Sequence, residues 1–182
     1  MKLYRIILVD DEEEVRKSII RKIKWEENGF LVAGDAENGE DALEKIEALE
    51  PDLILTDIRM PYMDGLTLAE RVRQKYPSMK IVIFSGYDDF EYAKQAIKLN
   101  VTEYILKPVN VEELTAILQK IKENLDQEIE QKRNVNLLRE NYIKSLPILR
   151  EQFLNELVNA PVASETVETR LKEYGIPLSG AQ

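Results

Sequence analysis

The stretch DLILTDIRMPYMDG, residues 52–65, carries the clearest structural signal in this chain. Its apolar residues form a continuous run, which is typical of a strand buried on both faces of a parallel sheet. The run leads directly into Asp57, and a Met-Pro turn follows at once. Because a carboxylate is costly to remove from water, its place at the end of a buried strand needs an explanation.

The pattern around this strand predicts a repeated strand–helix unit. Short apolar runs predict four more strands, at 4–10, 30–36, 80–86 and 102–107. Amphipathic stretches predict one helix between each pair of successive strands, counting the strand that ends at Asp57. These helices are expected at 12–25, 39–49, 65–76 and 89–100. This (βα)5 order predicts an α/β fold with a parallel sheet covered by helices on both faces. The strand at 30–36 is less purely apolar, so we expect it nearer an edge.

Polar residues before three of these helices are expected N-caps. They are Asn38, Asp64 and either Asp88 or Asp89.

The region after Pro108 predicts helices but no further domain core. A long helix should begin near Val111, and 126–146 should form a helical linker that is either a dimeric coiled coil or a helix packed on its own domain. Pro147 favours the first turn of another helix, and a last helix should run from Ser164 to Gly175. Since residues 147–182 cannot close a sizeable core, we expect a chain that is incomplete at its C-terminal end.

Composition excludes several kinds of chemistry. The 182 residues allow one ordinary domain plus extra material, and the formal net charge of −9 argues against non-specific binding to nucleic acid or anionic membranes. The sequence contains no Cys and no His, so thiolate or imidazole metal ligands and Ser-His or Cys-His nucleophiles are excluded. With no apolar segment near the ~20 residues that span a bilayer, a soluble cytoplasmic protein is expected.

Polar side chains stand at the carboxyl ends of four predicted strands. Asp10 and Asp11 follow the first, Asp57 the third, Ser85 the fourth and Lys107 the fifth. Each has an ordinary structural explanation: a helix cap, an Asx turn, a Ser-Gly turn and a solvated Lys-Pro loop. Together they favour a site, because parallel strands deliver their carboxyl ends to one edge of the sheet.

Three carboxylates in one crevice would repel each other unless a cation neutralised them. Mg²⁺ suits this set, because it prefers one or two carboxylates, waters and a phosphate oxygen. The set then fits phosphoryl transfer, in which Asp57 attacks, Mg²⁺ and Lys107 neutralise charge and Ser85 donates to a phosphoryl oxygen.

Three stretches together resemble the receiver domain of bacterial two-component response regulators. They are ILVDDE (7–12), LILTDIRMPYMDG (53–65) and IVIFSGYDDFEYAKQAIKLNVTEYILKPV (81–109). The resemblance covers about residues 1–125 and implies a flavodoxin-like doubly wound sheet of order 2-1-3-4-5, followed here by a helical extension. It implies that a sensor histidine kinase phosphorylates Asp57.

The resemblance also assigns roles around the acceptor. Asp11, Asp57 and the backbone carbonyl of Arg59 would bind Mg²⁺, and Asp10 would act through a water. Lys107 would pair with the phosphoryl oxygens, through a bond to Pro108 that is commonly cis.

Ser85 and Tyr104 would form a switch pair, although Tyr104 taken alone is more typical of a core residue. Arg59 and Tyr87 fall where side chains tune dephosphorylation.

The sequence of residues 86–109 most resembles that of a subgroup of these regulators that carries an AraC-type helix-turn-helix domain downstream. Residues 147–182 resemble the start of the intermediate region of that subgroup. Residues 126–182 hold nine acids and seven basic residues, so no basic patch replaces that domain. DNA contact is therefore expected through a domain absent from this sequence, in a longer parent that controls transcription. Dimerisation is expected through the fourth helix, fifth strand, fifth helix and linker.

Two other functions fit part of the pattern. Phosphatases of the haloacid-dehalogenase type also use an Asp at a strand end, but they place it on strand one with a second Asp two residues later. A receiver-like scaffold that works without phosphorylation usually lacks one of the acids or the Lys, and this sequence keeps them all.

Overall fold

The structure is a computed structural model that describes residues 3–86, 90–159 and 164–176. The chain divides into two compact units, Met1–Asp126 and Gln127–Gln182. The predicted caps at Asp88 or Asp89 and the side chain of Tyr87 lie outside the described residues. Within the described part of the chain, no helix combines the length and apolar character needed to cross a bilayer.

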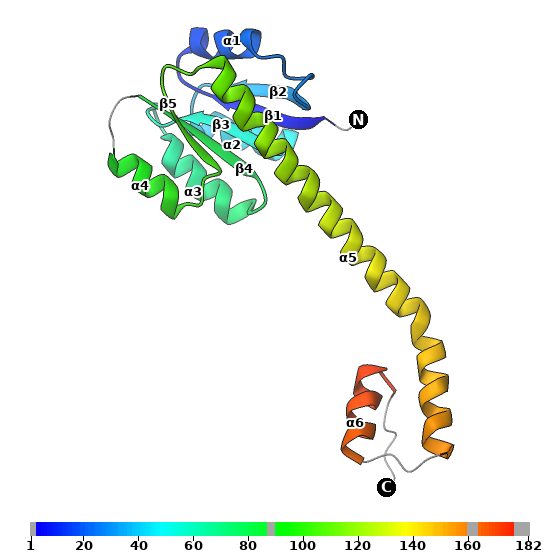
Figure 1. Cartoon of the computed structure of the whole chain (residues 1–182). Coiled ribbons are helices and arrows are strands. Elements are labelled where there is room, and N and C mark those ends of the chain that lie inside the picture. The colour runs from blue at the N-terminus through cyan, green and yellow to red at the C-terminus, as the bar shows by residue number, and fades with distance from the viewer. Residues whose placement is uncertain (1–2, 87–89, 160–163, 177–182) are drawn as a thin grey trace. The chain divides into compact units, whose positions relative to one another are not determined.

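The first unit is built on a five-stranded parallel sheet (Figure 1). Its strands are β1 (Tyr4–Val9), β2 (Phe30–Ala36), β3 (Leu53–Asp57), β4 (Lys80–Ser85) and β5 (Glu103–Leu106). They lie in the order β2-β1-β3-β4-β5, which confirms the expected flavodoxin-like topology and the edge position of β2. The carboxyl ends of β1, β3, β4 and β5 therefore meet at one edge of the sheet.

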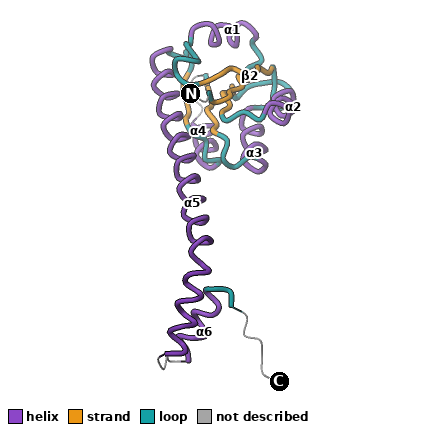
Figure 2. The backbone as a smooth tube through the Cα atoms, turned by 90° about the vertical axis from the view of Figure 1, so that its right-hand side faces the viewer, coloured by secondary structure: helices purple, strands orange, loops and turns teal. Residues whose placement is uncertain are grey.

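Helices cover both faces of this sheet, as Figures 1 and 2 show. They are α1 (Glu13–Lys22), α2 (Gly39–Leu49), α3 (Gly65–Lys75), α4 (Phe90–Lys98) and the first part of α5 (Val111–Asn159). Successive residues of β1 face opposite layers: Ile7 and Val9 pack with α2, α3 and α4, whereas Ile6 and Leu8 pack with α1 and α5. This alternation within an apolar run is what a strand buried on both faces requires.

Two of the predicted helix caps are confirmed. The side chain of Asn38 accepts hydrogen bonds from the backbone N–H groups of Glu40 and Asp41, and Asp64 accepts one from Thr67. Helix α1 instead follows Glu12, whose side chain makes no capping bond. The two caps orient the first turns of α2 and α3 beside the edge that carries the site.

The expectation that Pro147 starts a new helix is wrong. Helix α5 runs without a break to Asn159 and has Pro147 inside it. Proline cannot donate to the carbonyl of Ile143, one turn earlier, but its fixed φ is compatible with a helix. The neighbouring residues therefore continue the helix at the cost of one hydrogen bond.

The second unit has a small apolar contact of its own. Leu171 of helix α6 (Ser164–Glu173) and Phe153 of α5 are both buried. The Phe153 ring meets the Tyr174 ring edge-on at 5.7 Å. Gly175, at φ +61°, ends α6 as expected, because glycine adopts this backbone conformation without strain.

Candidate functional site

Lys107 connects two of the predicted acids at the carboxyl edge of the sheet. Its Nζ lies 2.9 Å from Oδ2 of Asp10 and 2.8 Å from Oδ1 of Asp57. Both carboxylate side chains are almost fully buried, and the Lys107 side chain is about three-quarters buried. Residues from the ends of β1, β3 and β5 thus form one ion-paired cluster.

A cavity of about 430 Å³ opens beside this cluster. Five of the residues predicted from the sequence line it: Asp11, Asp57, Arg59, Ser85 and Lys107. Asp10 joins the same cluster through its ion pair with Lys107. The structure therefore brings the predicted acids, hydroxyl and ammonium to one place.

Asp57 is held by the chain around it. Its Oδ2 accepts a hydrogen bond from the Arg59 N–H at 3.1 Å. This is an Asx-turn contact, so Asp57 also has the turn role that was its structural explanation from the sequence. Gly65 packs so tightly against this segment that a Cβ there would overlap the Asp57 carbonyl oxygen. The Gly65 N–H also donates to the Ile58 carbonyl at 2.9 Å. The turn after β3 thus fixes the carboxylate at the rim of the cavity.

Burial and Lys107 act on Asp57 in opposite directions. Burial raises the pKa of Asp57 above its ordinary 3.8, while the hydrogen bond and charge of Lys107 lower it, and Asp10 raises it further. Burial alone would lower the pKa of Lys107, but its hydrogen bonds to Asp57 and Asp10 leave that pKa above its ordinary 10.5. The ammonium group is therefore charged at neutral pH and serves as the permanent counter-charge of the two acids.

Ser85 and Tyr104 occupy different surroundings. Ser85 is buried, lines the cavity, and donates its hydroxyl to the Gly86 carbonyl at 2.8 Å. Tyr104 is half-buried and packs against the core layer formed with α2, α3 and α4, so the geometry agrees with a core position. The Lys107–Pro108 peptide bond is cis.

Two residues at the site were not predicted from the pattern. Tyr92 lines the cavity and its ring lies 5.8 Å from the Arg59 guanidinium. Arg16 is buried on α1 and donates to the Asp10 carbonyl at 2.5 Å. A signal for Arg16 existed: it stands four and seven residues before Ile20 and Ile23, on the apolar face of its helix.

The donor set fits a hard cation that keeps much of its own water. Two carboxylates, Asp11 and Asp57, line the same cavity, which has room for water as well. Among the described residues, no three acidic side chains lie close enough to form an all-protein metal cage. Mg²⁺ is usually bound by one or two carboxylates and water rather than by such a cage. The arrangement therefore suits Mg²⁺ held by Asp11 and Asp57.

The parallel sheet and the acid–lysine cluster at its carboxyl edge define a receiver-type α/β domain. Residues 6–119 match the family described as the response regulator receiver domain, and the chain belongs to this family.

Some relatives are similar to this chain over more residues than the receiver domain alone. The chain is 37% identical over 158 residues to an uncharacterized transcriptional regulatory protein, YesN, of Bacillus subtilis, covering 86% of this chain and 42% of YesN. It spans between about two fifths and three fifths of the length of the curated relatives that it matches.

Solved structures match the first unit. The receiver domain of AraT, a response regulator from Geobacillus stearothermophilus, aligns with a TM-score of 0.66 and 40% identity over 69% of this chain and 98% of its own. A two-component transcriptional regulator AraC from Clostridium phytofermentans aligns with a TM-score of 0.64 and 35% identity, over 68% and 96% of the two chains.

Proposed function

We propose that this chain is a phosphorylation-activated switch in which Asp57 accepts a phosphoryl group from a sensor histidine kinase. The observation that carries the proposal is the Lys107 ammonium group, which lies between the carboxylates of Asp10 and Asp57 at the edge of the cavity. This positive charge lies beside Asp57, where it would neutralise the negative charge of a phosphoryl group joined to that residue.

The chemistry assigned to Asp57 is a nucleophilic displacement. A carboxylate oxygen forms a bond to phosphorus as the bond between phosphorus and the donor's imidazole nitrogen breaks, and that nitrogen keeps the electron pair. Lys107 and the hydroxyl of Ser85 would hold the phosphoryl oxygens. Ser85 can reach them by rotating away from the Gly86 carbonyl that it now contacts.

The metal assigned to the site is Mg²⁺, bound by Asp11, Asp57 and the Arg59 carbonyl, with Asp10 acting through a water. It would supply positive charge for the transferring phosphoryl oxygens. Asp11 and Asp57 are the ligands that the cavity supports most directly.

Phosphate on Asp57 would bias two arrangements of the α4–β5–α5 face and so favour dimerisation. Tyr104, on β5, would move with this change. Exposed apolar residues on that face support the idea: Ile97 is 74% exposed and Leu106 is 57% exposed. Along the linker, α5 exposes Val135, Leu138 and Tyr142, whose spacing suits pairing with a second copy.

We place the receiver at 1–125, a helical linker at 126–146 and part of an intermediate region at 147–182. The output proposed for the longer parent is control of transcription through an AraC-type helix-turn-helix domain. The relatives named as transcriptional regulators support this.

Labelling by a small phosphodonor tests the acceptor. The intact chain should become phosphorylated by acetyl phosphate in the presence of Mg²⁺, and Asp57→Asn should abolish the label. Undiminished labelling of that variant would refute the assignment, and unlabelled wild-type protein would favour a scaffold that works without phosphorylation. Sedimentation with and without beryllofluoride plus Mg²⁺ tests the dimer, which should form with the phosphoryl mimic.

A further inference from the structure

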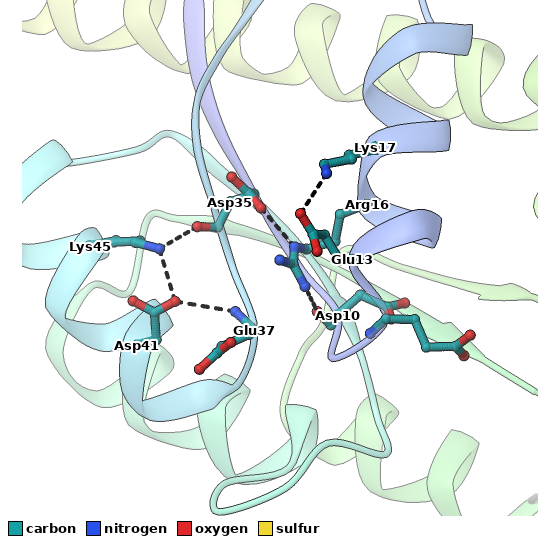
Figure 3. Close-up of polar contacts among 9 residues, drawn as sticks. Asp10, Glu13, Arg16, Lys17, Asp35, Glu37, Asp41 and Lys45 are labelled. Carbon is teal, nitrogen blue, oxygen red and sulfur yellow. Dashed lines mark hydrogen bonds and ion pairs between the residues drawn. The ribbon is translucent and has the colours of Figure 1, made fainter.

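Arg16 makes an unusual pair of contacts at the floor of the site. Its Nε donates to Oδ2 of Asp35 on β2 at 2.7 Å, and its Nη1 donates to the backbone carbonyl of Asp10 at 2.5 Å (Figure 3). The side chain is about nine-tenths buried, whereas that of Asp35 is 45% exposed. A buried guanidinium group is stable when such partners satisfy it, and its planar fork fixes the direction between them.

The carbonyl that Arg16 binds belongs to the peptide bond between Asp10 and Asp11. This peptide sets the direction in which both side chains leave the backbone. On either side of it, the Asp10 N–H donates to the Ala36 carbonyl at 3.1 Å, and the Glu12 N–H donates to Oδ1 of Asp10 at 2.9 Å. Arg16 therefore restrains the peptide that the two acids share.

The far end of this contact is itself anchored. Lys45 on α2 donates to the backbone carbonyl of Asp35 at 2.6 Å and pairs with Asp41 at 2.8 Å. Asp41 in turn accepts a hydrogen bond from the Glu37 N–H at 3.2 Å. Figure 3 shows these contacts as one chain of polar groups from α2 across β2 to Arg16 and Asp10.

Arg16 does not pair with the carboxylate of Asp10 or Asp11 in any of the contacts described, so it does not compete with a cation for them. Its recorded bonds go to a main-chain oxygen of Asp10 and to a carboxylate on another strand. Asp11 lines the cavity, and the Asp10 carboxylate keeps its pairing with Lys107. An arginine that paired with either carboxylate directly would compete with a cation.

We propose that Arg16, anchored by Asp35, is a positioning residue for divalent-cation binding: it orients the Asp10–Asp11 peptide so that Asp11 lines the cavity while the Asp10 carboxylate stays paired with Lys107. The inference rests on the proposed Mg²⁺ site. Partners that orient metal ligands typically change metal affinity by roughly 10–100-fold when they are removed.

Binding of Mg²⁺ alone to the full chain tests this. Titration with MgCl₂, followed by the amide NMR signals of Asp11 and Arg59, gives the dissociation constant without any labelling reaction. Arg16→Ala should weaken Mg²⁺ binding by about tenfold or more. Asp35→Asn, which removes the anchoring charge but keeps Arg16, should weaken it by a smaller factor.

Arg73→Ala is the matched control. Arg73 is a half-buried arginine on α3 that likewise donates to backbone carbonyls, those of Pro77, Met79, Leu99 and Asn100. These carbonyls precede β4 and β5, at the opposite edge of the sheet from the cavity. Its loss should lower stability towards urea yet leave the Mg²⁺ dissociation constant at the wild-type value.

A purely structural tie between α1 and β2 would give a different result: Arg16→Ala would be destabilised like Arg73→Ala but would bind Mg²⁺ as the wild type does. That outcome would overturn the inference alone. If Arg16→Ala does not fold, Arg16→Lys and Asp35→Asn decide the question, and wild-type affinity in both would overturn it. Wild-type protein without saturable Mg²⁺ shifts would overturn the metal site itself, and this inference with it.

Discussion

The Nζ of Lys107 lies 2.8 Å from Oδ1 of Asp57, a contact between residues that follow β5 and end β3. Lys107 makes a second contact to Asp10 at 2.9 Å, so one ammonium group serves two buried carboxylates. Removing it would leave both acids inside the fold with no cation among the contacts described. The chemistry proposed for Asp57 and the stability of this edge therefore depend on the same group.

Lys107→Met should slow phosphorylation of Asp57 by acetyl phosphate about 10²-fold, because loss of one preorganised donor to developing negative charge usually costs that much. The initial labelling rate at saturating Mg²⁺ is the measurement. Lys120→Met is the matched control, since Lys120 pairs with Glu103 on the surface at 2.5 Å. Equal rates in the two variants would show that Lys107 has no role in the transfer.

Asp57→Asn should make the folded protein more stable than the wild type at pH 7. Burial raises the pKa of Asp57 above 3.8, so the unfolded chain loses this proton at a lower pH than the folded chain does. Wild-type stability therefore falls as the pH rises from 3.8 through the folded pKa, whereas the variant lacks this loss. Urea unfolding across this range should show the difference shrinking towards zero in acid. A difference independent of pH would contradict the raised pKa.

Gly65→Ala should destabilise the first unit by about 3 kcal/mol, the upper end of the usual range for an overpacked site. The added Cβ would overlap the Asp57 carbonyl oxygen, which is backbone and cannot turn aside. Urea unfolding gives the change in free energy.

Gly86→Ala provides the comparison, since a Cβ there meets nothing within 4 Å. Similar losses in both variants would mean that Gly65 is not specially constrained.

Pro147→Ala should stabilise helix α5 by up to about 3 kcal/mol, because it restores a donor to the Ile143 carbonyl and removes the ring from the helix interior. Pro147 is exposed, so little packing is lost. Far-UV circular dichroism during thermal unfolding should show the helix melting at a higher temperature. The neighbouring substitution Ile148→Ala, at a residue that is 60% exposed, should leave the melting temperature nearly unchanged.

The sheet could be predicted because its evidence is local. The continuous apolar run before Asp57 and the repeated strand–helix order specify a parallel sheet without knowledge of any distant contact. The caps Asn38 and Asp64 are equally local, since each bonds to backbone groups two or three residues away. The strand order itself came from the family resemblance.

The same local reasoning was wrong at Pro147, where the surrounding helix tolerates a residue that usually begins one. The same local reasoning did not identify Arg16, because the contacts of Arg16 are to Asp35 and Asp10, which come close to α1 only in the folded protein. For the candidate site, the sequence indicates which side chains gather at the edge. It does not indicate that Lys107 pairs with both Asp10 and Asp57.

The end of the first unit is fastened to its beginning. The hydroxyl of Tyr4, on β1, donates to Oδ1 of Asp126 at 2.6 Å, and Lys122 pairs with the other oxygen of Asp126 at 2.5 Å. A protease that cuts the exposed helix beyond this residue would therefore leave the new C-terminal end of the fragment bonded to β1. Limited digestion should yield a durable piece of about 126 residues, which gives a natural boundary for expressing the receiver alone.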